Sequence, residues 1–332
     1  MPLYRTSKQR TRHRRRPRRP LHQLCTAYHL ALSSPRSNIT VLERDPTYAL
    51  ASATLSARGI RQQFALRQNV QMSLYGRNFL RSAHELLRVD EEEVDVQFQE
   101  KGYLFLASTE SGAEVMRRNH EVQVILCWGA MVVSFPCIGE RIDLIWFCVM
   151  EQHRGKDISN VYKVDNVVNA AGAHSAQLMA MLAGQKKLMH PIPVEPRKRC
   201  IFFFHCATEQ KGHVEDNGEA TGNFVCRVSP MKERDHAVHE MTDIDYADHE
   251  LWEEVIWPAL YHRAPALGEV KSKSSWAGLY EYNSLDQNAI VDFHPEVPNV
   301  LMACGFSGHG LQQAPAAGRA AAELLVNVNF RP

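Results

Sequence analysis

Residues 299–325 read NVLMACGFSGHGLQQAPAAGRAAAELL, and this stretch decides the fold. An apolar run typical of a strand leads into three closely spaced glycines, Gly305, Gly308 and Gly310. A long alanine-rich segment typical of a helix follows. Glycines between a strand and a helix permit positive φ and let a ligand approach the backbone closely. The start of such a helix carries unpaired N–H groups and a partial positive charge, which suit an anion or an electron-rich carbonyl group.

The residues alone leave a plainer interpretation open. A simple turn before a helix packed by its small residues would have the same pattern. A serine-hydrolase nucleophile turn would require Gly-x-Ser-x-Gly. Here Ser307 is followed at once by Gly308 and His309, which excludes that class of enzyme.

The segment before the strand makes the pattern more specific. Residues 276–290, WAGLYEYNSLDQNAI, and the later GFSGHGLQQAP resemble the C-terminal part of amine-oxidising flavoproteins of the D-amino-acid oxidase and sarcosine oxidase type. The resemblance covers residues 38–110 and 160–326. It implies an α/β fold with a Rossmann-like FAD-binding domain, incomplete in this chain, and an inserted mixed β-sheet substrate domain.

By this resemblance, the chain divides into several parts. The expected ranges are a basic presequence-like arm at 1–37, a discontinuous FAD-binding domain at 38–90, 156–187 and 285–330, a substrate domain at 91–121 and 188–284, and an unassigned apolar segment at 122–155.

The resemblance implies FAD as the cofactor. The binding is expected to be non-covalent, because no histidine lies between His29 and His84, where some relatives attach the flavin. Residues 38–45 are predicted to form a short buried strand that ends in an acid, as the ribose-binding strand of a dinucleotide fold does. In the loop at 51–64, Arg58 stands where the family usually has a glycine. The implied cofactor-binding residues are Glu43, Arg44, Ser52, Gly59, Ala171, Gly172, Gly305, Phe306, Ser307, Gly308, His309, Gly310, Leu311 and Gln312.

The implied reaction is oxidation of a C–N bond in an amino-acid-like amine, with hydride transfer to flavin. His309 and Tyr280 are the catalytic candidates on the substrate side. Arg197 or Arg199, at the start of a predicted strand, could bind a substrate carboxylate through a bidentate pair. Oxidases of the family commonly place a lysine shortly after the glycine turn. Gln312 lies in the corresponding stretch and favours a dehydrogenase or a non-catalytic role.

One family motif is missing. FAD enzymes of this class open with a strand, a Gly-x-Gly-x-x-Gly turn and a helix that binds the pyrophosphate. No glycine precedes Gly59, although residues 26–32 could be the second half of that helix. Two alternatives to an enzyme therefore stay open. One is an assembly factor for mitochondrial respiratory complex I, a role linked to one branch of the family, with structural FAD or none. The other is a truncated, catalytically inactive relative.

The charge distribution bears on location. Residues 1–42 hold ten Lys or Arg and no carboxylate. An arginine-rich, acid-free start is similar to a mitochondrial presequence, which predicts the mitochondrial matrix or the matrix face of the inner membrane. Pro17 and Pro20 interrupt any helix there, and a phosphate-binding or nuclear-targeting tail is the alternative. The expected partners are an amine or amino-acid substrate and, on the assembly hypothesis, complex I assembly intermediates. No specific nucleic acid is expected.

Other segments complete the expectations. The eight cysteines have no Cys-x-x-Cys spacing, and His236 and His239 lack a third ligand nearby, so no metal site is predicted. The apolar run at 122–150 approaches the length of a membrane span, but Pro136 interrupts it, and two buried strands are favoured. Helices are expected at 69–88, 110–121 and 243–262, strands at 94–98 and 102–107, and a strand, turn and helix at 165–178.

Overall fold

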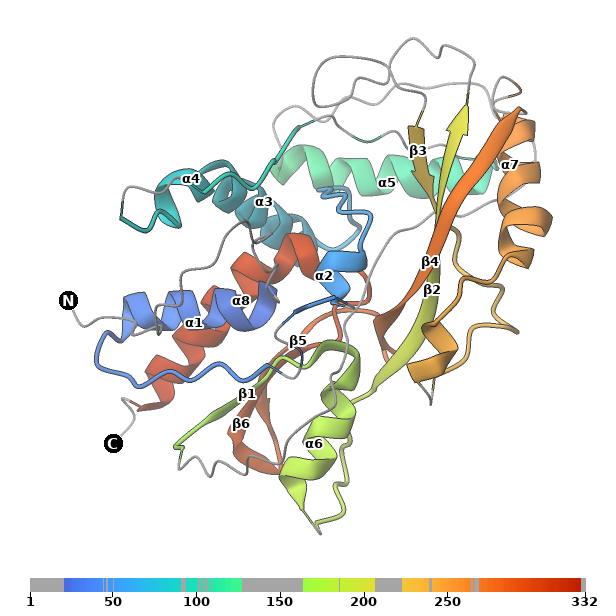
Figure 1. The fold of residues 1–332 in the computed structure, drawn as a ribbon. Coiled ribbons are helices and arrows are strands. Elements are labelled where there is room, and N and C mark those ends of the chain that lie inside the picture. The colour runs from blue at the N-terminus through green and yellow to red at the C-terminus, as the bar shows by residue number, and fades with distance from the viewer. Residues whose placement is uncertain are drawn as a thin grey trace, which may run out of the picture.

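The structure is a computed structural model. It describes residues 21–43, 45, 47–49, 51–90, 94–100, 103, 105, 107, 109–126, 164–184, 186–206, 223–238, 241–263, 265 and 269–329. Figure 1 shows the elements, which are, in chain order, α1 (Leu21–Ser33), α2 (Ser52–Leu55), α3 (Arg67–Arg81), α4 (Ala83–Leu86), α5 (Glu110–Leu126), β1 (Val167–Asn169), η1 (Gly172–His174), α6 (Ser175–Ala183), β2 (Val194–Cys206), β3 (Asn223–Cys226), η2 (Met241–Ile244), η3 (Leu251–Ile256, a π-helix), α7 (Trp257–Arg263), β4 (Val270–Asn283), β5 (Ile290–His294), β6 (Val297–Cys304) and α8 (Gly310–Asn329).

The first sheet has the order β1-β6-β5 and is covered on both faces. β1 is parallel to β6, and β5 is antiparallel to it. Side chains along β6 alternate between the faces, as the pleat of a strand requires. Val300, Met302 and Cys304 pack with residues of α6, whereas Leu301 packs with Ala321 and other residues of α8. A sheet between two helical layers is the α/β arrangement that the sequence predicts.

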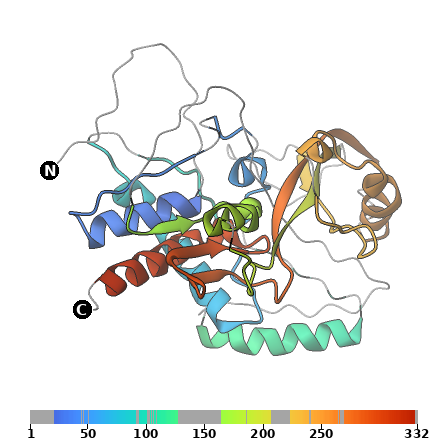
Figure 2. The same ribbon diagram turned by 90° about the horizontal axis from the view of Figure 1, so that it is seen from below.

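Two helices pack closely against α8. Figures 1 and 2 show α1 lying alongside α8, and α3 also contacts it. Glycines make these contacts possible. A Cβ atom on Gly318 would lie 2.5 Å from the carbonyl carbon of Cys25 on α1. A Cβ atom on Gly76 of α3 would overlap the carbonyl oxygen of Gln312.

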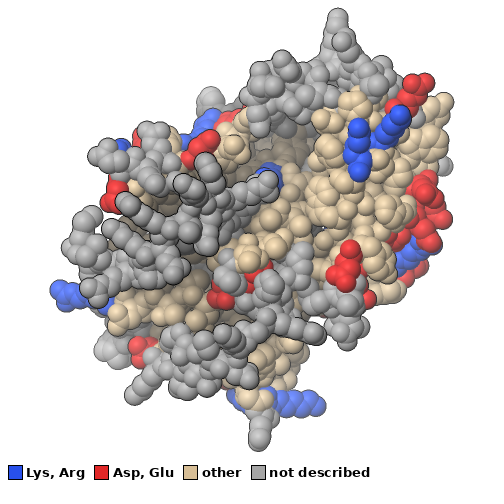
Figure 3. All heavy atoms as spheres, viewed as in Figure 1, with Lys and Arg blue, Asp and Glu red and all other residues tan. Residues whose placement is uncertain are grey.

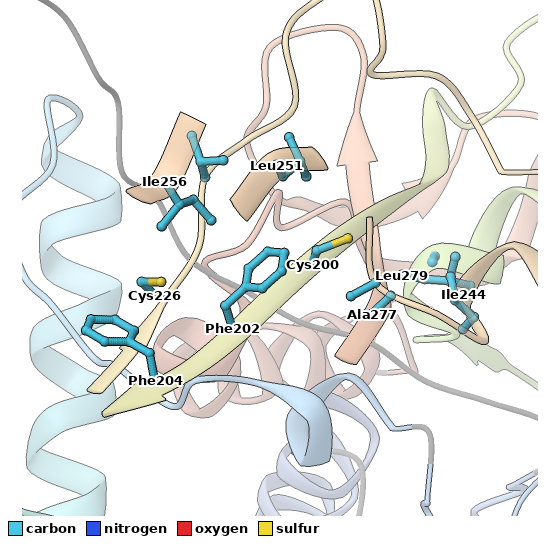
Figure 4. Packing of buried hydrophobic residues seen from close by; sticks show 12 residues of the cluster. Cys200, Phe202, Phe204, Cys226, Ile244, Leu251, Ile256, Ala277 and Leu279 are labelled. Atoms are coloured by element: carbon cyan, nitrogen blue, oxygen red, sulfur yellow. The ribbon is translucent and has the colours of Figure 1, made fainter. Parts of the chain in front are cut away.

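The second sheet, β3-β2-β4, is antiparallel and lies against η2, η3 and α7. Its buried face forms a hydrophobic core in which Phe202 and Phe204 of β2 meet Leu251 and Ile256 of η3, as Figure 4 shows. The acidic side chains Glu250, Glu253 and Glu254, in and next to η3, are exposed to solvent, and acids are visible along this margin of the molecule in Figure 3.

Several local predictions are confirmed. The helix expected at 69–88 is present as α3 and α4, and the helix at 110–121 is part of α5. The strand, turn and helix at 165–178 are β1, η1 and α6. The helix containing residues 26–32 is α1.

Four local predictions are wrong. Residues 38–43 form no strand and are largely exposed, with Leu42 63% exposed, because no neighbouring strand among the described residues pairs with them. Residues 94–98 form no strand either, and the described residues of 102–107 have none. The helix expected at 243–262 is divided into η2, η3 and α7. A local sequence pattern cannot reveal whether a strand finds a partner.

Some expectations concern the whole chain. Residues 127–163, which hold most of the apolar segment, lie outside the described residues. Among the helices that the structure does describe, none is long and apolar enough to cross a membrane. The same residues contain no group of three potential metal ligands. The division into domains stays a prediction.

Candidate functional site

The turn between β6 and α8 has the backbone that its glycines allow. Gly305 has φ 72° and Gly308 has φ 82°, both in the left-handed region. Ser307 has φ 45°, which costs a residue with a Cβ atom free energy that the surrounding contacts must offset. A strained residue within a buried turn indicates a site where backbone position is functional.

The turn opens onto the N-terminus of a long helix. α8 begins at Gly310. Within the described part of the chain, the N–H groups of Gly310, Leu311 and Gln312 donate to no acceptor. Together with the helix dipole, these donors form a site for negative charge or an electron-rich ring edge.

A second turn lies at the same edge of the first sheet. Because β1 and β6 are parallel, their carboxyl ends meet there. After β1, Ala171 donates its N–H to Asn169, and Gly172 has φ 56°. The predicted cofactor residues Ala171 and Gly172 therefore lie at the end of the sheet from which the β6–α8 turn starts, in the crevice where open α/β sheets bind ligands.

Strand β4 holds the β6–α8 turn through several hydrogen bonds. The Tyr280 hydroxyl donates to the Ser307 carbonyl oxygen at 2.5 Å. The Ser307 N–H donates to the Glu281 carbonyl oxygen at 3.1 Å. The Gly305 N–H donates to Glu281 Oε2 at 2.9 Å, and the Asn283 N–H donates to Ser307 Oγ at 3.0 Å. The second sheet therefore fixes the backbone of a turn that follows the first sheet.

The loop at 51–64 is attached to the second sheet and to α8. Leu55, in α2, accepts a hydrogen bond from the indole N–H of Trp276 at 2.8 Å. Arg61 donates its backbone N–H to Gln312 Oε1 at 2.8 Å. Arg58 has φ 56°, so the position where the family usually has glycine keeps a glycine-like backbone. Ser52 and Gly59 belong to this same loop.

His309 is a neutral imidazole at physiological pH. Burial is the main cause that lowers its pKa to about 3, and the positive charges of Arg61 and Arg227 act in the same direction. Its ring packs against Phe64, with 4.8 Å between ring centroids. A side chain of this kind can shape a pocket and form hydrogen bonds, but it is too weak a base to hold a proton there.

Tyr280 is buried and already donates its hydroxyl proton. Burial is the main cause that raises its pKa, so the phenol stays protonated. Its hydrogen bond to Ser307 makes it a residue that positions the turn. Whether Tyr280 and His309 are catalytic stays a prediction.

We expect the Tyr280→Phe substitution to destabilise the protein by about 1–3 kcal/mol, because the buried Ser307 carbonyl loses its donor. The measurement is thermal or urea unfolding of the purified variant. The Tyr282→Phe variant is the matched control on the same strand. An unchanged unfolding free energy for Tyr280→Phe would show that the bond is dispensable.

The two arginines predicted to bind substrate already have carboxylate partners. Arg199 forms two hydrogen bonds with Asp235, at 2.7 and 2.9 Å. Arg197 contacts Glu195 at 2.9 Å and Asp235 at 3.2 Å. Each guanidinium also lies over a tyrosine ring of β4. The geometry gives both side chains a structural role, and their substrate contact stays a prediction.

Two other arginines belong to the site, and sequence reasoning missed both. Arg61 lies over the ring of Phe64, with 4.7 Å from its guanidinium carbon to the centroid, and over that of Phe105 at 5.5 Å. Arg227, just after β3, is 2% exposed. Its positive charge adds to the lowering of the His309 pKa, and it partly opposes the rise that burial causes in the Tyr280 pKa. The position of Arg61 within the loop at 51–64 is a sequence signal that could have identified it. No sequence motif marks Arg227 as a site residue.

The remaining predicted residues have other surroundings. Glu43 accepts the Asp45 N–H at 3.0 Å. Arg44 lies outside the described residues. Phe306 is fully buried within the turn. The roles predicted for these residues in cofactor binding stay predictions.

Parallel strands that end in glycine turns, the unpaired N–H donors at the start of α8 and an antiparallel sheet bound to that turn together form a site suited to a dinucleotide cofactor. A family model described as DAO, FAD dependent oxidoreductase, matches residues 24–133 and 139–324. The chain belongs to this family of FAD-dependent oxidoreductases.

Relatives support this assignment. FAD-dependent oxidoreductase domain-containing protein 1 of Xenopus laevis is 34% identical over 374 residues, covering 88% of this chain and 74% of the relative. The Bos taurus protein of that name is 35% identical over 88% of this chain and 76% of its own length. Monomeric sarcosine oxidase of Bacillus sp. (strain NS-129) is 27% identical over 51% of this chain and 45% of its own length.

Solved structures share the fold. The crystal structure of L-proline dehydrogenase from P. horikoshii has a TM-score of 0.63 at 20% identity, covering 93% of this chain and 92% of that one. Glycine oxidase from Geobacillus kaustophilus has a TM-score of 0.62 at 15% identity, covering 93% of each chain.

The residues present fit the flavin end of FAD, the cofactor of the family. The N–H groups that start α8 would face an electron-rich ring edge, and the loop at 51–64 is fixed beside them through Gln312. When bound, FAD supplies the acceptor for a hydride. Residues 1–20, which precede α1, lie outside the described residues and contain no glycine.

Proposed function

We propose that this chain is a dehydrogenase for an amino-acid-like amine and that Arg61 binds the carboxylate of the substrate. The observation that carries the proposal is the state of the Arg61 side chain. It is partly buried between two aromatic rings, and no carboxylate within the described part of the chain lies within ion-pair distance of it. An arginine stays charged at any physiological pH, so this cation needs an anion.

The contrast with Arg197 and Arg199 supports this choice. Those two side chains have carboxylates within the protein, whereas burial lowers the Arg61 pKa and no carboxylate among the described residues offsets the effect. A charge that is desolvated without a partner is costly to the fold. A carboxylate from a substrate would remove that cost, which favours anionic substrates.

The surrounding groups then have distinct tasks. Arg61 would hold the carboxylate, and the neutral ring of His309 and the ring of Phe64 would keep water from the substrate. The N-terminus of α8 would stabilise the negative charge that develops on the cofactor ring. Oxidation of the C–N bond would move a hydride from the carbon to bound FAD and release a proton from the nitrogen, and water would hydrolyse the resulting imine to a carbonyl compound and an amine.

Gln312 supports a dehydrogenase over an oxidase. Its side-chain oxygen accepts the Arg61 N–H, so this residue is used to fix the loop. It also brings no cation that could help oxygen react.

The test begins with the visible spectrum of the purified protein before and after denaturation. A flavin spectrum released on denaturation would identify non-covalent FAD. N-methyl amino acids are then supplied with either an artificial dye or oxygen. We expect reduction of the dye with little hydrogen peroxide. A colourless protein that takes up no added FAD would contradict the proposal, and rapid peroxide formation would make the protein an oxidase.

Two finer aspects extend the proposal. We propose a mitochondrial location on the basis of the arginine-rich start of the sequence, and a role in complex I assembly as the second candidate function. Fluorescent fusions with and without residues 1–20 test the location. Depletion of the protein, followed by rescue with the wild type or an Arg61 variant, tests the assembly role, since a purely structural factor would not need Arg61.

A further inference from the structure

Glu281 places a carboxylate beneath the β6–α8 turn. The Gly305 N–H donates to it at 2.9 Å, and the Phe306 N–H is a second donor. The Ser307 N–H donates to the backbone carbonyl of the same residue at 3.1 Å. Three successive N–H groups of the turn are therefore directed to one residue of β4. No other residue described in the structure holds the turn through a titratable group that accepts its N–H donors.

These contacts act on a strained backbone. Gly305 and Ser307 are both left-handed, and the neighbours of Gly305 leave little room for a side chain, since a Cβ atom there would lie 3.0 Å from Val194 Cγ2. Hydrogen bonds to an ionised acceptor are about twice as strong as neutral ones. The charge state of Glu281 therefore decides how firmly the turn is held.

We propose that Glu281 is a positioning residue for the start of α8, and that its ionised carboxylate locks the β6–α8 turn while its protonated form loosens it. Protonation places a hydrogen on one carboxyl oxygen and weakens the acceptor that Gly305 and Phe306 share. The N–H groups of Gly310, Leu311 and Gln312 lie shortly after the turn, so their direction depends on it. The ligand for these donors would then bind better when Glu281 is ionised.

The surroundings place this change close to neutral pH. Burial raises the Glu281 pKa to about 7, and the two backbone donors oppose that rise. The titratable group that faces it from β6 is the Cys304 thiol, whose pKa is raised to about 12, mainly by burial, so it stays neutral. Opposite it on β2 lies Pro196, flanked by Glu195 and Arg197, which pair with each other. η1 ends in His174.

The sign of the pH effect on stability follows from the raised pKa. The folded protein binds this proton more tightly than the unfolded chain does. The stability that Glu281 contributes is therefore fully present at pH values below 4.5, the ordinary pKa of the group. It is lost as the pH rises through the raised pKa of about 7. Ionisation of Glu281 therefore tightens the turn but lowers the free energy of unfolding of the protein. The reason is that the desolvation of the buried carboxylate is larger than the stabilisation by its two hydrogen bonds.

The test compares the wild type with Glu281→Gln, a neutral side chain of the same shape, between pH 5.5 and 8.5. Glu269→Gln, exposed just before β4, is the control. The first readout is the hydrogen-exchange protection of the Gly305 and Phe306 amides, measured by NMR on the protein without cofactor. We expect protection in the wild type and in Glu269→Gln to rise roughly tenfold through pH 7, and to stay flat in Glu281→Gln.

The second readout is the dissociation constant for FAD, obtained from flavin fluorescence. This readout rests on the proposed function. The dissociation constant should fall as the pH rises in the wild type but not in Glu281→Gln. Hydrogen-exchange protection of these amides that is the same in the wild type and in Glu281→Gln at every pH would overturn the inference. If the protein binds no FAD at any pH, the proposed function fails, while the exchange data still decide the role of Glu281.

Discussion

Gly76→Ala is expected to destabilise the protein severely, although it adds only one methyl group. The new Cβ atom would overlap the Gln312 carbonyl oxygen, and backbone atoms cannot turn aside as a flexible side chain can. Helix α3 would have to move away from the first turn of α8. Overpacking of this kind costs about 1–3 kcal/mol and occasionally more. We expect the upper end of that range, since the contact is with backbone.

Gly318→Ala tests the other close contact of α8. Its Cβ atom would lie 2.5 Å from the Cys25 carbonyl carbon and 2.6 Å from the Thr26 nitrogen, so α1 would have to shift. The measurement for both variants is urea unfolding followed by circular dichroism. Gly112→Ala, in the first turn of α5, is the matched control. The nearest atom to its new Cβ atom would be the Thr109 hydroxyl oxygen at 3.1 Å, which belongs to a movable side chain.

The contrasting result is easy to recognise. If Gly76→Ala and Gly318→Ala unfold at the same urea concentration as Gly112→Ala, the three helices are packed less closely than the glycine contacts indicate. Because Gln312 lies in the first turn of the helix whose N–H groups face the site, Gly76→Ala should also weaken FAD binding, whereas Gly112→Ala should not.

Arg61→Met is expected to abolish most of the activity toward carboxylated amines. The variant keeps a long side chain that packs between Phe64 and Phe105, but it removes the charge. Loss of one partner of a buried charge pair costs about 2–5 kcal/mol, which corresponds to a fall of about 30-fold or more in kcat/KM. The decrease should arise mainly from KM if Arg61 binds the carboxylate equally in the ground and transition states.

Three comparisons separate binding from general damage. Arg118→Met, an exposed residue of α5, should behave as the wild type. The backbone N–H of residue 61 remains in the variant, so the loop should stay attached to Gln312 and FAD binding should be unchanged. An amine without a carboxylate should lose no activity from the substitution. Equal losses for both kinds of substrate would contradict the role proposed for Arg61.

Much of the local structure was predictable from the sequence. The glycines at 305, 308 and 310 favour a turn with positive φ, and Gly305 and Gly308 both have it. The apolar run of β6 and the helix expected at 69–88 likewise depend on residues that are close together in the chain. Such features depend on backbone geometry and side-chain periodicity, which a short window of sequence contains.

Features that a short window of sequence could not decide share one physical cause. Residues 38–43 have the composition of a strand, yet among the described residues they find no partner with which to form a ladder. Arg197 and Arg199 have the charge that a substrate carboxylate needs, and the fold also places Asp235 beside both of them. Whether a strand pairs or a charge is free depends on residues distant in the chain.

The sequence by itself determined the α/β class, the glycine turn and the family to which the chain belongs. Only the tertiary structure decided which residues surround that turn. Arg61 meets Gln312 across 251 positions, and Tyr280 meets Ser307 across 27. A local pattern cannot encode such contacts, because they form only when the sheets and helices pack together. The same packing removes water from His309 and Glu281 and thereby shifts their pKa values in opposite directions.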